Sequence, residues 1–311
     1  MDTLLIVDGH AIIHRAYHAL PAFKTKGGVP TNALYGFVTM LDTAIKDFNA
    51  THVVVCLDSP EKTFRDDMFP EYRSHRPKVD EDLIKQFPMV RDFLRAAHIT
   101  QIEKGGFEAD DLIATIVHNE KDKDLIKLIL TGDKDILQLV DSQKHILVAT
   151  PQNGNKKPLI YDDEAVTKRF NVGPKNIADF KALAGDSSDN YKGVAGIGPK
   201  TAAQLINQFG TLEEIYEHVD DIQNPTIREK LVADKENATL SKKLALLDLN
   251  VPIDIQLENL AFTSYNEELK NFFEEYQFNS LKRRFFNESA KPIQRLVKNK
   301  KAQPKNQLGL F

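Results

Sequence analysis

The sequence predicts an α/β fold built on a mostly parallel sheet, followed by a smaller helical module. Two observations carry this prediction: short apolar runs alternate with amphipathic segments over about the first 170 residues, and such runs then stop. A third observation concerns the site, because three of the apolar runs end at aspartates. In folds of this class the site lies beyond the carboxyl ends of the strands.

The strands are predicted from short runs that are rich in β-branched residues. "TLLIVDG", "THVVVCLD" and "DLIKLILTGDKD" have the length of buried strands, and they end at Asp8, at Asp58 and at the pair Asp133 and Asp135. "KHILVAT" and "PLIYDDE" predict two later strands. The aspartates are therefore expected to meet at one edge of the sheet.

Helices are predicted between these strands from the spacing of apolar residues. "ALYGFVTMLDTAIKDF", "EADDLIATIVHNEKD" and the proline-containing "LIKQFPMVRDFLRAAHI" show this spacing. The intervening segment 59–82 is polar, marked by prolines and rich in aromatic residues and arginine. We expect it to be exposed and to arch away from the body.

From about residue 171 the pattern changes to short helices separated by Gly, Pro and Asn. The predicted division is a first domain over residues 1–170, a helical module over 171–290 and a tail over 291–311. The tail is rich in Lys, Asn, Gln and Pro, and it has too few apolar residues to order itself.

Composition limits the class of protein. The net charge is −4, yet residues 281–311 hold nine Lys or Arg and one acid, so the rest of the chain is strongly acidic. No run of about 18 apolar residues predicts a membrane span, and the first residues lack the basic lead of a signal peptide. The single cysteine, Cys56, permits no internal disulfide, which favours a reducing cytoplasm.

Nine acids form the candidate site, and their spacing aligns several of them. Glu108 and Asp111 are three apart at a predicted helix start, so both lie on one face. Asp186 and Asp189 in "GDSSDN" are also three apart. Taken singly, each pair has a simpler explanation as solvated surface. The full set is Asp8, Asp58, Glu108, Asp110, Asp111, Asp133, Asp135, Asp186 and Asp189.

So many carboxylates cannot share a cleft unless protons or cations neutralise them. The sequence has no Cys and His cluster of the kind that holds structural zinc. All-oxygen ligation indicates Mg²⁺ or Mn²⁺, and a pair of such ions clamps the attacking and leaving oxygens in phosphoryl displacement. The predicted reaction class is metal-assisted hydrolysis of a phosphodiester.

"GVAGIGPKTAAQLINQFG" is like a phosphate-binding loop in composition only, because Pro199 separates Gly198 from Lys200 and no predicted strand precedes it. A helix-hairpin-helix explains it better, since Gly196 and Gly198 permit a tight turn and Pro199 suits a first helical turn. The N–H groups at that helix start and Lys200 would then contact a DNA phosphate. A plain connection between helices is the alternative.

"FRDDMFPEYRSHRP" combines Arg65, Arg73 and Arg76 with Tyr72 and His75. Cations next to aromatic faces are typical of surfaces that bind frayed or single-stranded nucleic acid. The alternative for this segment is a solvated loop.

These motifs, in this order, resemble the 5′ nuclease of bacterial DNA polymerase I and its flap endonuclease relatives. The resemblance covers about residues 1–290 and rests on "LLIVDGHAIIHRAYHA", "YGF", "FR…YRSHRP", "GFEADDLIAT", "LTGDKDILQLV" and "ALAGDSSDNYKGVAGIGPKTA". It implies a PIN-like domain with a helical arch over about residues 60–97, and a helix-three-turn-helix module with its hairpin at 193–203. It also implies a metal-dependent nuclease that cuts 5′ flaps and trims 5′ ends of DNA in replication and repair.

The resemblance implies a role for each matching residue. Two or three divalent ions would be held by Asp8, Glu108, Asp110, Asp133, Asp135, Asp186 and Asp189, with Asp58 and Asp111 in support. K⁺ would bind at the hairpin. Contacts with DNA are implied at Gly36, Phe37, Arg65, Gly196, Gly198, Lys200 and Thr201.

The resemblance implies catalytic roles for Tyr72, Arg73 and Arg76, and the two arginines would stabilise negative charge in the transition state. The family usually has Tyr-Lys where this chain has Tyr72 and Arg73, and an arginine fork differs in geometry from a lysine point charge. All acidic positions of the motifs are present, which argues against an inactive nuclease.

The chain stops at Phe311 without the proofreading-like and polymerase regions of polymerase I, so we expect a free-standing nuclease that acts as a monomer. Its last residues, Gln307, Leu308, Gly309, Leu310 and Phe311, resemble the pentapeptide that binds the bacterial sliding clamp. The basic run before them would act as a tether near DNA. The alternative is a frayed tail with apolar residues by chance.

Three rival functions remain open at the level of sequence. They are a catalytically silent DNA-binding or scaffolding protein, a PIN-type ribonuclease and an acid-rich phosphatase. The arch and hairpin favour DNA over the second and third, and the full set of acids disfavours the first.

Overall fold

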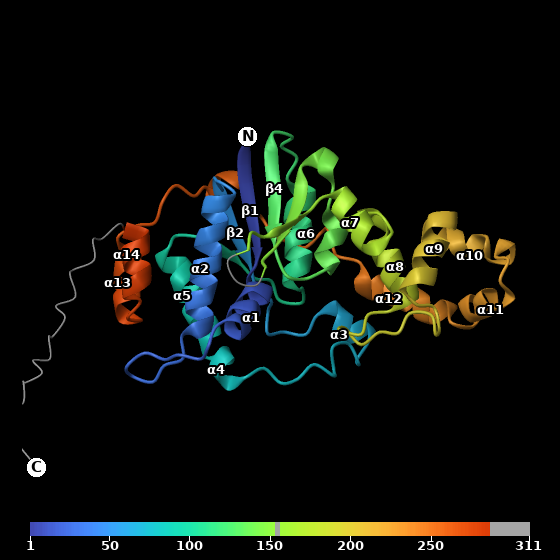
Figure 1. The fold of residues 1–311 in the computed structure, drawn as a ribbon, viewed down its shortest axis with the longest axis horizontal. Coiled ribbons are helices and arrows are strands. Elements are labelled where there is room, and N and C mark those ends of the chain that lie inside the picture. The colour runs from blue at the N-terminus through green and yellow to red at the C-terminus, as the bar shows by residue number, and fades with distance from the viewer. Residues whose placement is uncertain (153–155, 287–311) are drawn as a thin grey trace, which may run out of the picture.

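The computed structural model describes residues 1–152 and 156–286 and contains a six-stranded sheet with order β3-β2-β1-β4-β5-β6 (Figure 1). All neighbours are parallel except β5 and β6, which are antiparallel. The strands are β1 (Asp2–Asp8), β2 (His52–Cys56), β3 (Thr100–Ile102), β4 (Leu125–Leu130), β5 (Ile146–Thr150) and β6 (Leu159–Tyr161).

The strand order reverses at β1, because β2 lies on one side of it and β4 on the other. The chain after β1 and the chain after β4 therefore leave the sheet in different directions. Such a switch point opens a crevice at the carboxyl ends of the two strands. Asp8 ends β1 at this crevice, and Thr131 directly follows β4.

Alternation along the strands divides the core into two layers. Leu5 and Val7 of β1 face one layer, and Leu4 and Ile6 face the other. The first layer contains α1 (Gly9–Ala19), α2 (Asn32–Asp47) and α5 (Gln86–Ala96), and the second contains α6 (Ala109–Asn119).

The helical module continues the layer of α6, since its buried apolar residues belong to the same core. Figure 1 shows α8 to α12 gathered at one end of the molecule. The helices are α7 (Asp163–Phe170), α8 (Ile177–Ala184), α9 (Pro199–Phe209), α10 (Leu212–Glu217), α11 (Pro225–Ala233) and α12 (Lys235–Ala245). Short 3-10 turns are η1 (Asp135–Leu139), η2 (Ser142–Lys144), η3 (Pro174–Asn176), η4 (Val219–Asp221) and η5 (Leu257–Leu260).

The last two helices, α13 (Glu268–Glu275) and α14 (Asn279–Phe286), return to the opposite end of the molecule (Figure 1). The sequence groups them with the helical module, but they pack against the layer of α2 and α5. The ring of Phe273 stacks on Phe93 with centroids 6.5 Å apart. Their apolar faces therefore cover the first domain and not the hairpin.

The segment that arches away from the body is shorter than the predicted 60–97. It begins with α3 (Phe64–Met68), crosses the molecule without regular helix and reaches α4 (Glu81–Ile84) (Figure 1). The predicted proline-containing helix is divided at Lys85, and its second part, α5, is buried through Val90 and Phe93. The arch therefore ends before α5.

None of the helices within 1–152 and 156–286 is both long enough and apolar enough to cross a bilayer.

Candidate active site

The crevice at the switch point is built around Asp8. Its Oδ1 accepts a hydrogen bond from the N–H of Ala11 at 3.0 Å, so this carboxylate caps the start of α1. Its Oδ2 accepts from the hydroxyl of Thr131 at 2.6 Å. Asp8 is therefore fixed by both strands that border the crevice.

The chain after β4 places two more acids at the same edge. The N–H of Asp133 donates to the hydroxyl oxygen of Thr131 at 2.9 Å, and the N–H of Asp135 donates to Asp133 Oδ1 at 2.9 Å. These local bonds form a tight turn directly after the strand. They explain why a "TGDKD" sequence presents two carboxylates here.

The start of α6 supplies further acids to the crevice around Asp8. Glu108 is the capping residue of this helix and Asp110 lies in its first turn; both are buried. Asp58 follows β2, and its Oδ1 accepts from the N–H of Ala109 at 2.8 Å. Asp58 thus holds the start of α6 in place, and its supporting role toward metal ions stays a prediction.

A second acidic group lies between η1 and the helical module. Asp135, Asp186 and Asp189 each offer a carboxylate oxygen, and these oxygens lie within 4.8 Å of one another. The ammonium of Lys181 contacts both Asp135 and Asp186. Burial raises the pKa of Asp186, but the charge of Lys181 and hydrogen bonds from Lys181 and Ser188 outweigh burial and leave this pKa below its ordinary value.

Burial and crowding disfavour charge on the other acids. Burial raises the pKa of Asp8 to about 7 despite the bond from Thr131, and the charge of Asp58 adds to this effect. The pKa of Asp110 is raised well above its ordinary value by burial and by the charges of Asp133 and Asp8. Burial also raises the pKa of Asp133. These carboxylates need a cation to ionise together, and their oxygen-only set fits Mg²⁺ or Mn²⁺.

Three residues of the arch lie directly on these acids. The hydroxyl of Tyr72 donates to Asp189 at 3.1 Å, and Arg73 pairs with both Glu108 and Asp189 at 3.0 Å. Arg76 pairs with Asp189 at 2.6 Å. Burial raises the pKa of Glu108 even though Arg73 opposes that shift. The arch therefore delivers its cations to the acidic crevice.

Arg65 is buried against Asp111, which bears on the predicted roles of both residues. Its side chain is 1% exposed, it forms a two-bond fork with Asp111 at 2.8 Å, and it donates to the carbonyl oxygens of Leu244 and Leu246. The predicted contact of Arg65 with DNA is therefore wrong. Asp111, at 0% exposure and occupied by this fork, is a structural partner and not a metal ligand.

The predicted DNA contact at Phe37 is also wrong, whereas the contact at Gly36, which lines a groove along α2, stays a prediction. Phe37 is fully buried and meets Phe93 edge to face, with centroids 6.3 Å apart. Gly36 is buried where α2 crosses α1, and a Cβ there would lie 2.7 Å from the Cβ of Ala16. Both residues serve close packing of two helices.

The hairpin residues lie away from the acids, at the start of α9. Gly196 has a φ of +74°, which favours glycine, and Gly198 caps the helix. Lys200 is exposed and Thr201 is half-buried on the first turn. Their contact with DNA stays a prediction.

Sequence reasoning missed Thr131 and Lys181. Thr131 stands between the β4 run and the acidic turn, and its position alone pointed to the crevice. Lys181 lies in α8 and is 8% exposed. A lysine in an amphipathic helix usually faces solvent, so only the acids five and eight residues later offered a signal.

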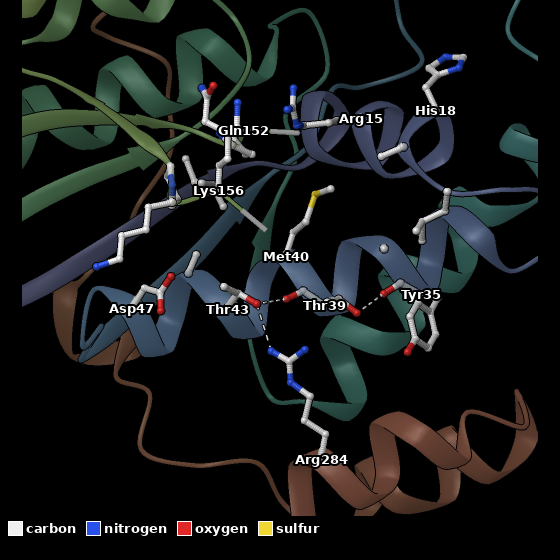
Figure 2. Close-up of a pocket in the computed structure, with 18 residues that line it drawn as sticks. Arg15, His18, Tyr35, Thr39, Met40, Thr43, Asp47, Gln152, Lys156 and Arg284 are labelled. Atoms are coloured by element: carbon white, nitrogen blue, oxygen red, sulfur yellow. Dashed lines mark hydrogen bonds between the residues drawn. The ribbon is translucent and has the colours of Figure 1, made fainter. Parts of the chain in front are cut away.

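A basic groove of about 810 Å³ lies along α2, outside the acidic crevice. Figure 2 shows Arg15 and His18 of α1 on one side of α2 and Arg284 of α14 on the other. Lys156 and Lys157 lie beside it in the connection from β5 to β6. Among the residues that line the groove, Asp47 is the acid.

The predicted clamp-binding residues Gln307, Leu308, Leu310 and Phe311 lie outside the described residues.

Comparison with protein families gives two matches. Residues 3–171 match the model of the 5′-3′ exonuclease N-terminal resolvase-like domain, and residues 172–268 match that of the 5′-3′ exonuclease C-terminal SAM fold. The second match ends where α13 begins.

Curated relatives agree with these matches. The chain is 37% identical to the 5′-3′ exonuclease of Aquifex aeolicus over 90% of this chain and 94% of that protein. It is 36% identical to DNA polymerase I of Bacillus caldotenax, over 89% of this chain and 32% of that protein. The chain thus spans about a third of the DNA polymerase I relatives.

Solved structures share the fold. The T5 5′-exonuclease with bound zinc has a TM-score of 0.64 at 21% identity, over 89% of this chain and 98% of that chain. The catalytic core of Rad2 in complex with DNA has a TM-score of 0.56 at 17% identity, over 88% and 87%. With the acidic crevice, both family matches and the full-length Aquifex relative in agreement, the chain belongs to the 5′-3′ exonuclease family.

Proposed function

We propose that this chain is a divalent-metal-dependent 5′ nuclease that hydrolyses phosphodiesters at 5′ flaps and 5′ ends of branched or nicked duplex DNA. Its place would be primer removal and repair during replication. The observation that carries the proposal is the crevice itself, where carboxylates from three strand ends and one helix start meet the cationic arch.

The acids would hold the ions in two groups. Bound Mg²⁺ or Mn²⁺ would supply Lewis acidity and a water of lowered pKa. The protein itself positions the carboxylates, because Thr131 and the turn after β4 hold Asp8 and Asp133 in place. Arg73 and Arg76 present guanidinium donors beside Asp189, where a phosphodiester would reach the acids. The ligands would be Asp8, Glu108, Asp110 and Asp133 in one group and Asp135, Asp186 and Asp189 in the other.

DNA as the substrate is supported by the neighbours in fold. The T5 D15 flap endonuclease was solved with DNA and metal ions, and human GEN1 was solved with Holliday junction DNA. Figure 1 shows α2, which the groove follows, and α9, which the hairpin precedes, on opposite sides of β1 and α6. A branched substrate with two duplex arms would use both, one arm for each basic surface.

K⁺ at the hairpin completes the cofactors that the family resemblance implies. At that position the ammonium of Lys230 already donates a hydrogen bond to the carbonyl oxygen of Gly196 at 3.1 Å.

The proposed protein partner is the bacterial sliding clamp, bound through Gln307, Leu308, Leu310 and Phe311 by a monomeric nuclease of the cytoplasm and nucleoid. The support is the order of residues in "QLGLF", with apolar anchors that fit a groove. Deletion of residues 307–311 should abolish capture by the clamp and leave cleavage of a bare flap unchanged. Undiminished capture would reject the clamp proposal.

Cleavage of a labelled 5′-flap duplex in Mg²⁺ tests the main proposal, with the cut site mapped. Asp133→Asn should abolish cleavage because it removes charge from the ligand group, yet binding should persist. Tight binding without any product by the intact chain would instead indicate a silent binding protein. Faster cleavage of an RNA flap would favour a ribonuclease, and faster turnover of a small phosphomonoester would favour a phosphatase.

A further inference from the structure

The hairpin before α9 contains a tight turn of four residues. The N–H of Ile197 donates to the carbonyl oxygen of Val194 at 3.0 Å, which closes a four-residue turn. Gly196 is the third residue of this turn and has a φ of +74°. A type II turn requires a positive φ at this position. The carbonyl oxygen of Gly196 lies outside the closing hydrogen bond.

Lys230 of α11 and Asp234, which follows α11, both form hydrogen bonds with this turn. Asp234, between α11 and α12, accepts from the N–H of Ala195 at 2.7 Å. One helical turn earlier, Lys230 of α11 donates from Nζ to the carbonyl oxygen of Gly196 at 3.1 Å. The ammonium lies so close that the atom nearest to a Cβ added at Gly196 would be Lys230 Nζ. The turn is thus held by an anion on one side and a cation on the other.

This contact bears on the K⁺ that the family resemblance implies at the hairpin. A monovalent ion there needs backbone carbonyl oxygens, and the oxygen of Gly196 already accepts from an ammonium group. A second positive charge on the same oxygen would be repelled by the ammonium group. A K⁺ that is ligated by the Gly196 oxygen therefore does not fit beside Lys230.

We propose that the ammonium of Lys230 is the built-in cation of the hairpin and takes the place of K⁺. An ammonium carries three N–H donors, of which one is used on Gly196. The other donors are available to a phosphate of duplex DNA, next to the start of α9 and the exposed Lys200. This inference rests on the proposed binding of duplex DNA by the hairpin, and it makes that binding indifferent to the kind of monovalent salt.

The test measures binding of a labelled duplex by fluorescence anisotropy, in chelator, in potassium chloride and in tetramethylammonium chloride at equal ionic strength. Tetramethylammonium is too large to enter the turn. The intact chain should bind with the same Kd, within about twofold, in both salts. Lys230→Met should bind about tenfold more weakly in tetramethylammonium, which is about 1.4 kcal/mol, and K⁺ should restore part of the loss by binding the vacated carbonyl oxygen.

Two further variants control for charge and folding. Lys235→Met removes the same charge from the neighbouring helix, where Lys235 lies over the ring of Tyr216; it should remain indifferent to the salt. Lys230→Arg keeps a cation on the turn and should behave like the intact chain. Tightening by K⁺ in the intact chain, or equal behaviour of Lys230→Met and Lys235→Met, would overturn the inference. Failure of every protein to bind duplex in either salt would overturn the proposed function, and this inference with it.

Discussion

Lys181, Arg73 and Arg76 balance the charge of the acidic crevice. Each contacts at least one carboxylate of the second acidic group, Asp135, Asp186 and Asp189. Acids that cannot stay charged alone are thus held by cations of the chain itself. Divalent ions would compete with these cations, so ligand binding and arch position are coupled at single residues.

Asp8 makes the burial of the acidic crevice measurable through pH. Its pKa is raised from 3.8 to about 7 because burial disfavours the charged form. The folded chain then holds this proton more tightly than the unfolded chain, so the free energy of unfolding falls as pH rises from about 4 to about 7. Thermal unfolding in chelator should show Tm falling over this range. Asp8→Asn should make the fall less steep, and the raised pKa values of Asp110 and Asp133 account for the remainder.

Asp2→Asn is the matched control, because Asp2 lies on the same strand but is exposed; this variant should keep the full slope. Added Mg²⁺ should lessen the slope in the intact chain, since the ion compensates the charge. Equal slopes in the intact chain and in Asp8→Asn would contradict the raised pKa.

Arg65 joins three elements. It lies in α3 and pairs with Asp111 of α6. It also donates to the carbonyl oxygens of Leu244 and Leu246 at the C-terminal end of α12. Arg65→Lys should lower the free energy of unfolding by about 3–5 kcal/mol, because the lysine cannot form the fork and leaves Asp111 buried without its partner. Urea unfolding measures the loss.

Arg95→Lys makes the same change at an exposed ion pair with Asp92 and should have almost no effect. If Arg65→Lys unfolds at the same urea concentration as Arg95→Lys, the fork does not hold these elements together.

The sequence predicted the elements that depend on local pattern and failed where distant partners decide. The strands before Asp8 and Asp133 follow from short β-branched runs and from turn residues that lie within a few positions of each other. The burial of Arg65 depends on carbonyl oxygens about 180 residues later, and no local pattern contains them. The family resemblance implies a DNA contact for Phe37. Its place among the apolar residues on one face of a helix fits the core better.

The same limit applies to α13 and α14. Their amphipathic pattern predicts a buried face but not the surface that covers it. The structure places that face on α5, far from the hairpin (Figure 1).

At the scale of the whole molecule, the basic groove along α2 (Figure 2) and the hairpin before α9 belong to elements on opposite sides of β1 and α6 (Figure 1). The double change Lys156→Glu and Lys157→Glu should weaken binding of a nicked duplex more than binding of a short duplex that fills one arm. The dependence of log Kd on log salt should fall by about two, one for each lost phosphate contact. Anisotropy over a salt series in chelator measures both effects.

Lys121→Glu with Lys123→Glu is the matched double change, since both lysines are exposed in the segment before β4. The start of a parallel strand lies opposite the site, so the salt slope should not change. An equal change of slope in both double variants would show a general charge effect and not a groove.

The packing of α13 and α14 on the first domain also affects how the chain folds during translation. Synthesis delivers the N-terminal residues first, but the face of α5 that carries Phe93 is covered by Phe272 and Phe273 near the end of the described chain. Until about residue 286 has left the ribosome, the nascent chain carries an uncovered apolar layer beside a parallel sheet. Such late, long-range closure slows folding and leaves the growing chain prone to aggregation, so it should depend on chaperones during translation more than its helix content implies.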